Sequence, residues 1–128
     1  MHCFHKTHNV SPLGIKVLTF LFEMVESPEN PWLGPLVAAI PLVRNLSATD
    51  RVPVAMDGLH GVFGRIAGKK DSYVNFLGSL TEPPCTEGVE WFVMLSPLTV
   101  SRLQYETFRS VMGSNFRPVQ RNLYDVEA

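Results

Sequence analysis

The sequence has few cysteines, almost no net charge and no long apolar run. Its two cysteines, Cys3 and Cys85, do not make a disulfide framework. The formal net charge of −1 gives no basic face, so we expect no nucleic-acid partner. No apolar run reaches the roughly 18 residues of a membrane-spanning helix. With 128 residues, 45% of them hydrophobic, the chain is expected to fold as one globular domain.

The most apolar segment, residues 17–22, has two possible interpretations. Lys6 and Lys16 precede it, which loosely mimics the basic and apolar regions of a signal peptide. However, Glu23 follows at once, and no clean small-residue cleavage site comes after it. Its Val, Leu and Phe residues suit a strand, so a buried strand is the preferred interpretation.

Hydrophobic periodicity predicts that strands dominate. Residues 14–25 are predicted to form a strand, or two short strands, buried on both faces. Residues 73–77 fit a short strand. Residues 89–95 fit a strand in which alternate residues share one face. We expect loops and short pieces over residues 45–70 and an extended tail over residues 115–120.

Two helices are also predicted. The first carries an apolar stripe and is predicted to end or kink at Pro41; its stripe residues are Leu33, Leu36, Val37, Ile40 and Val43. The second begins with a capping box, in which Ser101 is the N-cap and Gln104 lies three residues on. Gly113 suits its C-terminal end.

Three histidines, His2, His5 and His8, lie three residues apart. A catalytic zinc site needs three protein ligands and one open position. On a strand, His2 and His8 would face one side and His5 the other, so one strand cannot supply three converging imidazoles. The alternative is a polar segment that happens to contain histidines.

The segment GSLTEPPCTEGVEW, residues 78–91, places a stiff loop just before a strand. Pro83 restricts Glu82 to extended geometry, which would help to fix the nearby Thr81 hydroxyl. A fixed hydroxyl can orient a metal-bound hydroxide, although a lone threonine is usually structural. Cys85 alone suggests a small buried apolar residue. The loop glutamates Glu82, Glu87 and Glu90 resemble a solvated face more than a paired-carboxylate site.

These residues resemble the alpha-class carbonic anhydrases. The loop matches the family hallmark G-S-L-T-T-P-P-C-x-E-x-V-x-W, including Val89 and Trp91. Asn115 and the sequence Arg117-Pro118-Val119-Gln120 resemble the closing asparagine and R-P-x-Q. Gly14-Ile15-Lys16-Val17-Leu18 resembles the strand G-L-A-V-L, and Phe108-Arg109 fits the last helix. The motifs occur in the family's order along nearly the whole chain.

The resemblance implies a zinc enzyme that hydrates CO2 to bicarbonate. The family holds zinc with three histidines, two from H-x-H-W and one from E-x-H-x-x-H. His2 resembles the third ligand, and His5 resembles a histidine that is usually buried and structural. Zinc lowers the pKa of bound water to about 7, which supplies hydroxide at neutral pH.

The resemblance also assigns the substrate site. Thr81 resembles the threonine whose hydroxyl accepts the proton of the zinc-bound hydroxide and whose backbone N–H discriminates anions. Phe4 stands where valine is commoner, which would narrow the apolar wall that receives CO2. That wall resembles a set of five residues, namely Leu80, Val89, Trp91, Ile15 and Val17.

Several family features are missing from this sequence. It contains no H-x-H-W, and the acidic residue two before His2, the glutamate that holds the threonine and the proton-shuttle region are absent. Glu82 replaces the second threonine of T-T-P-P, and its charge should repel bicarbonate. Cys85 resembles the disulfide cysteine of extracellular members, but Cys3 cannot be assumed to be its partner.

We therefore expect residues 1–128 to form the C-terminal half of the domain, which is a large, twisted, mostly antiparallel sheet. One histidine cannot hold catalytic zinc, so the chain alone is expected to be inactive. Three hypotheses follow: an incomplete record of a full enzyme, a non-catalytic carbonic anhydrase-related binding module, or two chains that complete one sheet. An open sheet edge favours self-association. The family's extracellular members, Cys85 and the glycosylation motif at Asn45 favour an extracellular or membrane-anchored location.

Overall fold

The computed structural model describes residues 1–6, 14–43, 47, 51–56 and 72–120. The chain forms two compact units, which we describe separately. The first unit comprises Met1–Leu21, Asp71–Pro97 and Phe116–Ala128, and the second comprises Phe22–Lys70 and Leu98–Asn115. His8, Asn45 and most of the predicted loop region 45–70 lie outside the described residues.

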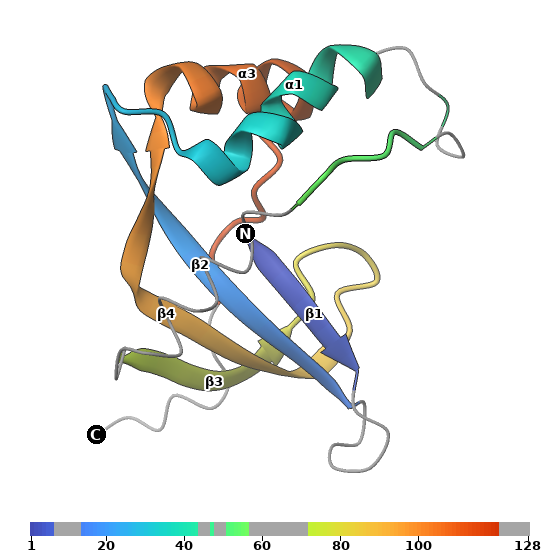
Figure 1. Ribbon diagram of the computed structural model, residues 1–128. Helices are drawn as coiled ribbons and strands as arrows, with labels where there is room; N and C mark the ends of the chain where they lie inside the picture. The colour runs from blue at the N-terminus through green and yellow to red at the C-terminus, as the bar shows by residue number, and fades with distance from the viewer. Residues whose placement is uncertain (7–13, 44–46, 48–50, 57–71, 121–128) are drawn as a thin grey trace. The chain divides into compact units, whose positions relative to one another are not determined.

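Four strands form one sheet in the order β1-β2-β4-β3 (Figure 1). They are β1 (His2–Lys6), β2 (Ile15–Val25), β3 (Tyr73–Ser79) and β4 (Glu87–Ser101). β1 pairs antiparallel with β2, and β3 pairs antiparallel with β4. The central strands β2 and β4 run in the same direction, so the sheet is mixed (Figure 1). The prediction of a mainly β chain with a few helices is confirmed.

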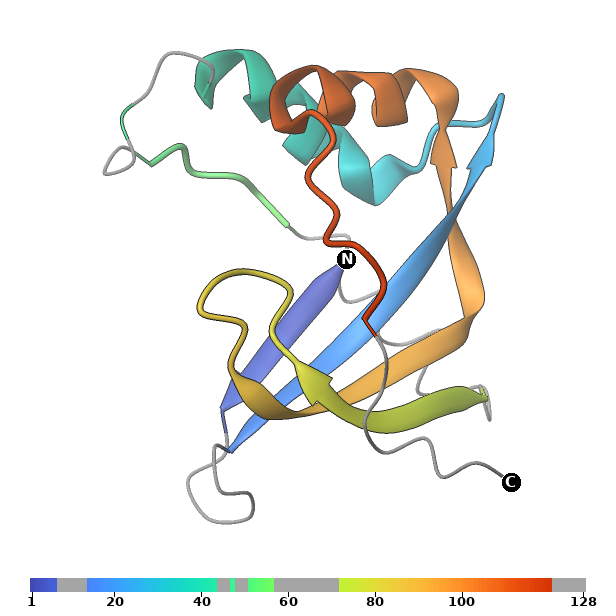
Figure 2. The same cartoon turned by 180° about the vertical axis from the view of Figure 1, so that it is seen from behind.

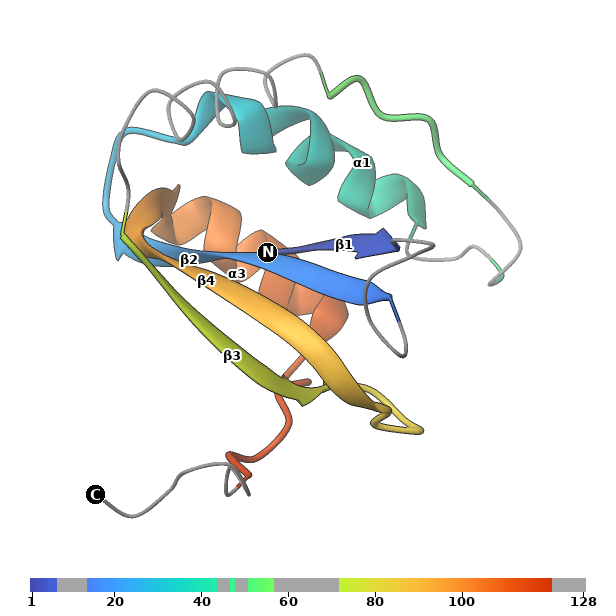
Figure 3. The same cartoon turned by 90° about the horizontal axis from the view of Figure 1, so that it is seen from below.

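The core of the first unit lies where β2 and β4 bring apolar residues together. Val17, Val89 and Trp91 form a buried cluster, against which Ile15 and Leu80 pack. Val17 and Val89 are completely buried. Figure 3 shows the central strands between the edge strands β1 and β3. All five residues belong to motifs that the sequence analysis singled out.

The predicted strand over residues 14–25 is a single strand, but the prediction that both its faces are buried is wrong beyond Phe20. Leu21 and Met24 are each 47% exposed. They border open hollows instead of a filled core: Leu21 lines the cavity of the first unit, and Met24 lines a smaller hollow in the second.

The strand predicted over residues 89–95 extends from Glu87 to Ser101. Val89 and Trp91 are buried, Val93 is half-buried and Leu95 is 51% exposed. Alternation therefore does not bury Leu95. Its position explains this, because the neighbouring strand β3 begins at Tyr73, opposite the preceding residue Met94.

The second unit contains the 3₁₀ turn η1 (Pro31–Leu33) and the helices α1 (Gly34–Val43) and α3 (Arg102–Met112). The helices α1 and α3 pack against each other (Figure 1). α1 continues through Pro41, so Pro41 does not end it. This proline lies in the last turn of the helix, where losing one backbone hydrogen bond costs less than it would in the middle.

The predicted capping box of α3 is confirmed. The Ser101 hydroxyl accepts a hydrogen bond from the Gln104 N–H at 3.2 Å, and the Gln104 side chain accepts one from the Ser101 N–H at 3.2 Å. Gly113 ends the helix with φ of 63°, in the left-handed region that favours glycine. None of the described helices is long and apolar enough to cross a membrane.

Candidate functional site

The hallmark loop joins β3 to β4 (Figure 2). The Leu80 N–H donates to the Thr86 carbonyl at 2.9 Å, which closes the loop at its base. Inside it, the Cys85 N–H donates to the Glu82 carbonyl at 2.8 Å, and Cys85 has the positive φ of 54°. Thr81 follows Leu80 directly, so these bonds constrain the backbone on both sides of the threonine.

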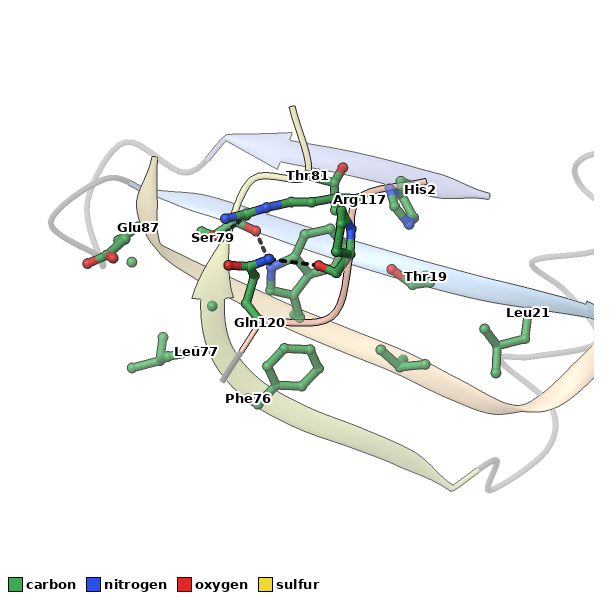
Figure 4. A pocket seen from close by; sticks show the side chains of 15 residues that line it. His2, Thr19, Leu21, Phe76, Leu77, Ser79, Thr81, Glu87, Arg117 and Gln120 are labelled. Carbon is green, nitrogen blue, oxygen red and sulfur yellow. Dashed lines mark hydrogen bonds between the residues drawn. The ribbon is translucent and has the colours of Figure 1, made fainter. Parts of the chain in front are cut away.

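The C-terminal tail contacts this loop through Arg117. One guanidinium nitrogen, Nη1, donates to the Ser79 hydroxyl at 2.8 Å and to the Leu80 carbonyl at 3.0 Å. Figure 4 shows Arg117 and Ser79 among the residues that line the cavity. The Trp91 indole N–H donates to the Ser79 carbonyl at 3.2 Å. Three chain segments therefore meet at the two residues that precede Thr81.

A cavity of about 800 Å³ lies within the first unit (Figure 4). Of the predicted site residues, His2, Thr81 and Trp91 line it. The structure thus brings the proposed orienting threonine and the proposed zinc histidine to one cavity, with an aromatic ring also in its wall. Lining residues that sequence reasoning did not assign to a site include Thr19, Leu21, Phe76, Ser79, Arg117 and Gln120.

The residues of the predicted apolar wall pack together, but most of them do not line the cavity. Of its five residues, only Trp91 is among those that line the cavity. Ile15, Val17, Leu80 and Val89 form or adjoin the buried cluster around the Trp91 ring. The Phe76 ring stacks on Trp91 at a centroid distance of 6.4 Å.

His2 faces the cavity from β1. It pairs with Thr19 of β2, and its ring meets the Trp91 ring edge-on at 5.0 Å. His2 is an exposed residue, yet the partial burial of its ring lowers the pKa of the imidazole. This favours the neutral ring, which is the form that binds metals.

Thr19 carries a buried hydroxyl that sequence reasoning missed. The residue is 7% exposed, and its Oγ1 has no hydrogen-bond partner among the described residues. The only signal in the sequence is a polar residue within an apolar run. Arg117 was also missed as a site residue. Its motif was recognised, but a linear motif does not say which loop its side chain reaches.

The remaining predicted site residues lie away from the cavity. Phe4 is 55% exposed and meets the His2 ring edge-on at 6.3 Å. Glu82 is exposed on the loop and is not among the cavity-lining residues. His5 is exposed, unlike the buried family histidine that it resembles. Cys3 and Cys85 are both free thiols, and burial raises the pKa of the Cys3 thiol.

Lys16 departs from the family strand and lies on the opposite face of the sheet from Ile15 and Val17, because neighbouring residues of a strand alternate. Its ammonium forms an ion pair with Glu90 at 2.8 Å and lies 5.7 Å from the centre of the Phe92 ring. The hydrogen bond that the Lys16 ammonium donates is the main cause of the lowered pKa of the Glu90 carboxyl, and a hydrogen bond from the Asn75 side chain at 3.3 Å lowers it further. Lys16 therefore leaves the apolar wall intact.

The described residues do not fit a catalytic zinc ion. Such an ion needs three protein ligands, and no group of three histidine, cysteine, aspartate or glutamate side chains lies together within the described ranges. His2 is the one histidine among the cavity-lining residues. Cys3 and His5 project to the other face of β1, because side chains alternate along a strand.

The model of the eukaryotic-type carbonic anhydrase family matches residues 3–126. The chain belongs to this family, the alpha carbonic anhydrases.

Comparison with relatives shows how much of the carbonic anhydrase domain this chain covers. A carbonic anhydrase of Pectobacterium carotovorum is 36% identical over 108 residues, covering 84% of this chain and 41% of that protein. A human carbonic anhydrase-related protein is 42% identical across 64 aligned positions, covering 38% of this chain and 22% of that protein.

A solved structure supports the fold. The alpha carbonic anhydrase of Aspergillus oryzae superposes with a TM-score of 0.75 at 24% identity, over 96% of this chain and 50% of that one. The chain therefore spans less than half the length of the curated relatives described here and half of this solved structure.

Proposed function

We propose that this chain supplies the C-terminal half of a zinc-dependent carbonic anhydrase site, which converts CO2 and water to bicarbonate and a proton. The observation that carries the proposal is the shared cavity, which Thr81 lines together with His2 and Trp91. Thr81 stands on the family's hallmark loop, and His2 lies on the edge strand β1.

The chain's own residues account for three parts of this activity. The Thr81 hydroxyl orients the reacting oxygen, and its backbone N–H selects among anions. The Trp91 ring, supported by the buried cluster, gives CO2 an apolar surface that water solvates poorly. His2 offers a neutral imidazole as one ligand out of the three that zinc needs.

We propose further that the isolated chain is inactive, since its described residues offer no set of three ligands. In a stopped-flow assay of CO2 hydration, the chain with added zinc is expected to give the rate of buffer alone. A rate well above buffer that is abolished by His2→Ala would contradict this proposal. Zinc content measured after dialysis, for wild type and for His2→Ala, checks the same point without activity.

A hybrid protein tests the site itself. The chain is joined behind the N-terminal half of a relative that carries H-x-H-W, and CO2 hydration is measured. We expect the hybrid to be active, Thr81→Ala to lower kcat/KM by on the order of 100-fold, and Thr81→Ser to retain most activity. An active hybrid that tolerates Thr81→Ala would overturn the assigned role of Thr81.

A second candidate function is a non-catalytic binding module. It is favoured by the similarity to a protein named carbonic anhydrase-related and by the absence of three gathered ligands among the described residues. Reading the transcript upstream of the first codon separates the two. A reading frame that continues into H-x-H-W supports the enzyme. A start at Met1, together with cooperative unfolding of the isolated chain, supports the module.

A further inference from the structure

Arg117 is the residue outside the hallmark loop that holds the peptide entering Thr81. Its Nη1 atom donates to the Leu80 carbonyl at 3.0 Å and to the Ser79 hydroxyl at 2.8 Å. The residue is half-buried and lines the same cavity as Thr81. A single nitrogen therefore bridges two acceptors that are consecutive in the chain.

The Leu80 carbonyl belongs to the same peptide unit as the Thr81 N–H. A peptide unit is planar, and a trans peptide points its carbonyl and its N–H in opposite directions. The unit between Leu80 and Thr81 is not among the cis bonds of the described chain. A bond that fixes the direction of the Leu80 carbonyl therefore also fixes the direction of the Thr81 N–H.

The other polar groups around this peptide unit are held by different partners. The Leu80 N–H is bonded to the Thr86 carbonyl at 2.9 Å, and the Ser79 carbonyl to the Trp91 indole at 3.2 Å. Among the described hydrogen bonds, Arg117 alone reaches the Leu80 carbonyl. The Leu80 N–H and the Ser79 carbonyl are thus held by residues of the loop and of β4, whereas the Leu80 carbonyl is held by Arg117 of the C-terminal tail.

The charge of Arg117 adds to this effect. A cationic donor on a carbonyl polarises the peptide unit, which makes the N–H at its other end a stronger donor. Among the described residues, ion pairs join Lys16 to Glu90 and Arg102 to Glu26, and no described carboxylate pairs with the Arg117 guanidinium.

We propose that Arg117 is a positioning residue that aims and polarises the backbone N–H of Thr81 toward an anion in the cavity. The anion is a small oxyanion of the bicarbonate type, so this inference rests on the function proposed above. The geometric part, that Arg117 orders the loop, stands independently of catalysis.

Amide hydrogen exchange of the full chain, followed by nuclear magnetic resonance, tests the geometric part. Arg117→Ala is expected to speed exchange of the hydrogen-bonded Leu80 and Cys85 amides by at least about tenfold, since a lost tertiary bond lets the loop open locally. The core amides of Val17 and Val89 should keep their protection. Unchanged loop amides, or an equal loss of protection in the core, would overturn the inference.

Two further variants make the test specific. Arg117→Lys should restore part of the protection, because one nitrogen supplies both bonds and a lysine ammonium has three donors. If Arg117→Ala does not fold, the exchange is measured on Arg117→Lys instead. Loop amides that exchange as slowly as in wild type in both variants would contradict the proposal. Arg102→Ala is the matched control, because Arg102 is an exposed arginine paired with Glu26 at 2.7 Å.

The anion part is tested in the active hybrid. With bicarbonate as the probe, Arg117→Ala is expected to weaken product inhibition about tenfold, and Arg102→Ala to leave it unchanged. If the hybrid is inactive, the proposed function fails while the exchange experiment still judges the role of Arg117 in the loop. If the hybrid is active and bicarbonate inhibition is unaltered in Arg117→Ala, the polarising role is wrong.

Discussion

At the scale of single residues, Val89 tests whether the buried cluster stabilises the first unit. Val89 is completely buried, and Val89→Ala removes two methyl groups and leaves a small cavity. We expect the free energy of unfolding to fall by about 2 kcal/mol, measured by urea denaturation. Val119→Ala is the matched control, because Val119 is 99% exposed. An equal effect of both substitutions would contradict the assignment of this core.

The ion pair between Lys16 and Glu90 predicts a pH dependence of stability. The hydrogen bond from Lys16 lowers the pKa of the Glu90 carboxyl in the folded chain. The stabilisation is therefore complete above the unfolded value of about 4.3 and is lost as the pH falls through the lower folded value. Urea denaturation at a series of pH values should show a shallower acid slope for Glu90→Gln.

Lys16→Met serves as the control for this pair. It should flatten the same part of the pH profile, and combining it with Glu90→Gln should flatten it no further. Additive effects of the two substitutions would show that the two residues act on stability independently. This would contradict a stabilising role for their ion pair at 2.8 Å.

Residue positions were predictable where a long motif covered them. The hallmark loop led to Thr81, which lines the cavity, and the motif strands led to the five residues that pack together in one apolar cluster. The contact of Arg117 was not predictable, because it depends on the path of a tail that follows α3. Nor was the exposure of Leu21, since a strand pattern records apolar character and not whether any segment covers it.

At the scale of elements, Gln104 joins helix α3 to the segment before η1. Its side chain is 1% exposed, donates to the Asn30 carbonyl at 2.8 Å and accepts from the Asn30 N–H at 2.9 Å. Gln104→Ala leaves these buried groups without partners, so the free energy of unfolding should fall by about 3 kcal/mol. Ser101→Ala, which removes one capping bond, should cost only about 1 kcal/mol.

Denaturation of the two variants and of Ser114→Ala checks this order. Ser114 is exposed just beyond α3, and its substitution should change stability by less than about 0.5 kcal/mol. If Gln104→Ala costs no more than Ser101→Ala, the bonds to Asn30 contribute nothing measurable. The sequence indicated the capping box, but not Asn30, because that partner is 74 residues away in the chain.

At the scale of the whole molecule, the edge strand β3 exposes apolar side chains. Tyr73, Val74 and Leu77 are 56%, 47% and 51% exposed, and β3 has a neighbour on one side only within the described sheet. Unpaired edges of this kind promote association between chains. We expect the isolated chain to self-associate with increasing concentration in sedimentation velocity experiments.

Charged substitutions identify the surface responsible. Val74→Lys should shift the chain toward the monomer, since a lysine on an edge strand opposes pairing. Val119→Lys, which adds the same charge on the exposed tail, should not. A chain that stays monomeric at all concentrations, or that responds equally to both substitutions, would contradict this prediction.

The bond between the tail and the loop has a consequence for protein synthesis. Ribosomes make chains from the N-terminus, so Ser79, Leu80 and Thr81 emerge well before Arg117. The buried cluster can form earlier, because its members end at Trp91. The threonine loop therefore acquires its final hydrogen bonds after the residues of the buried cluster have been made. A ribosome that stalls before the Arg117 codon leaves a chain that contains the whole buried cluster but lacks the hydrogen bonds that hold the Leu80 carbonyl.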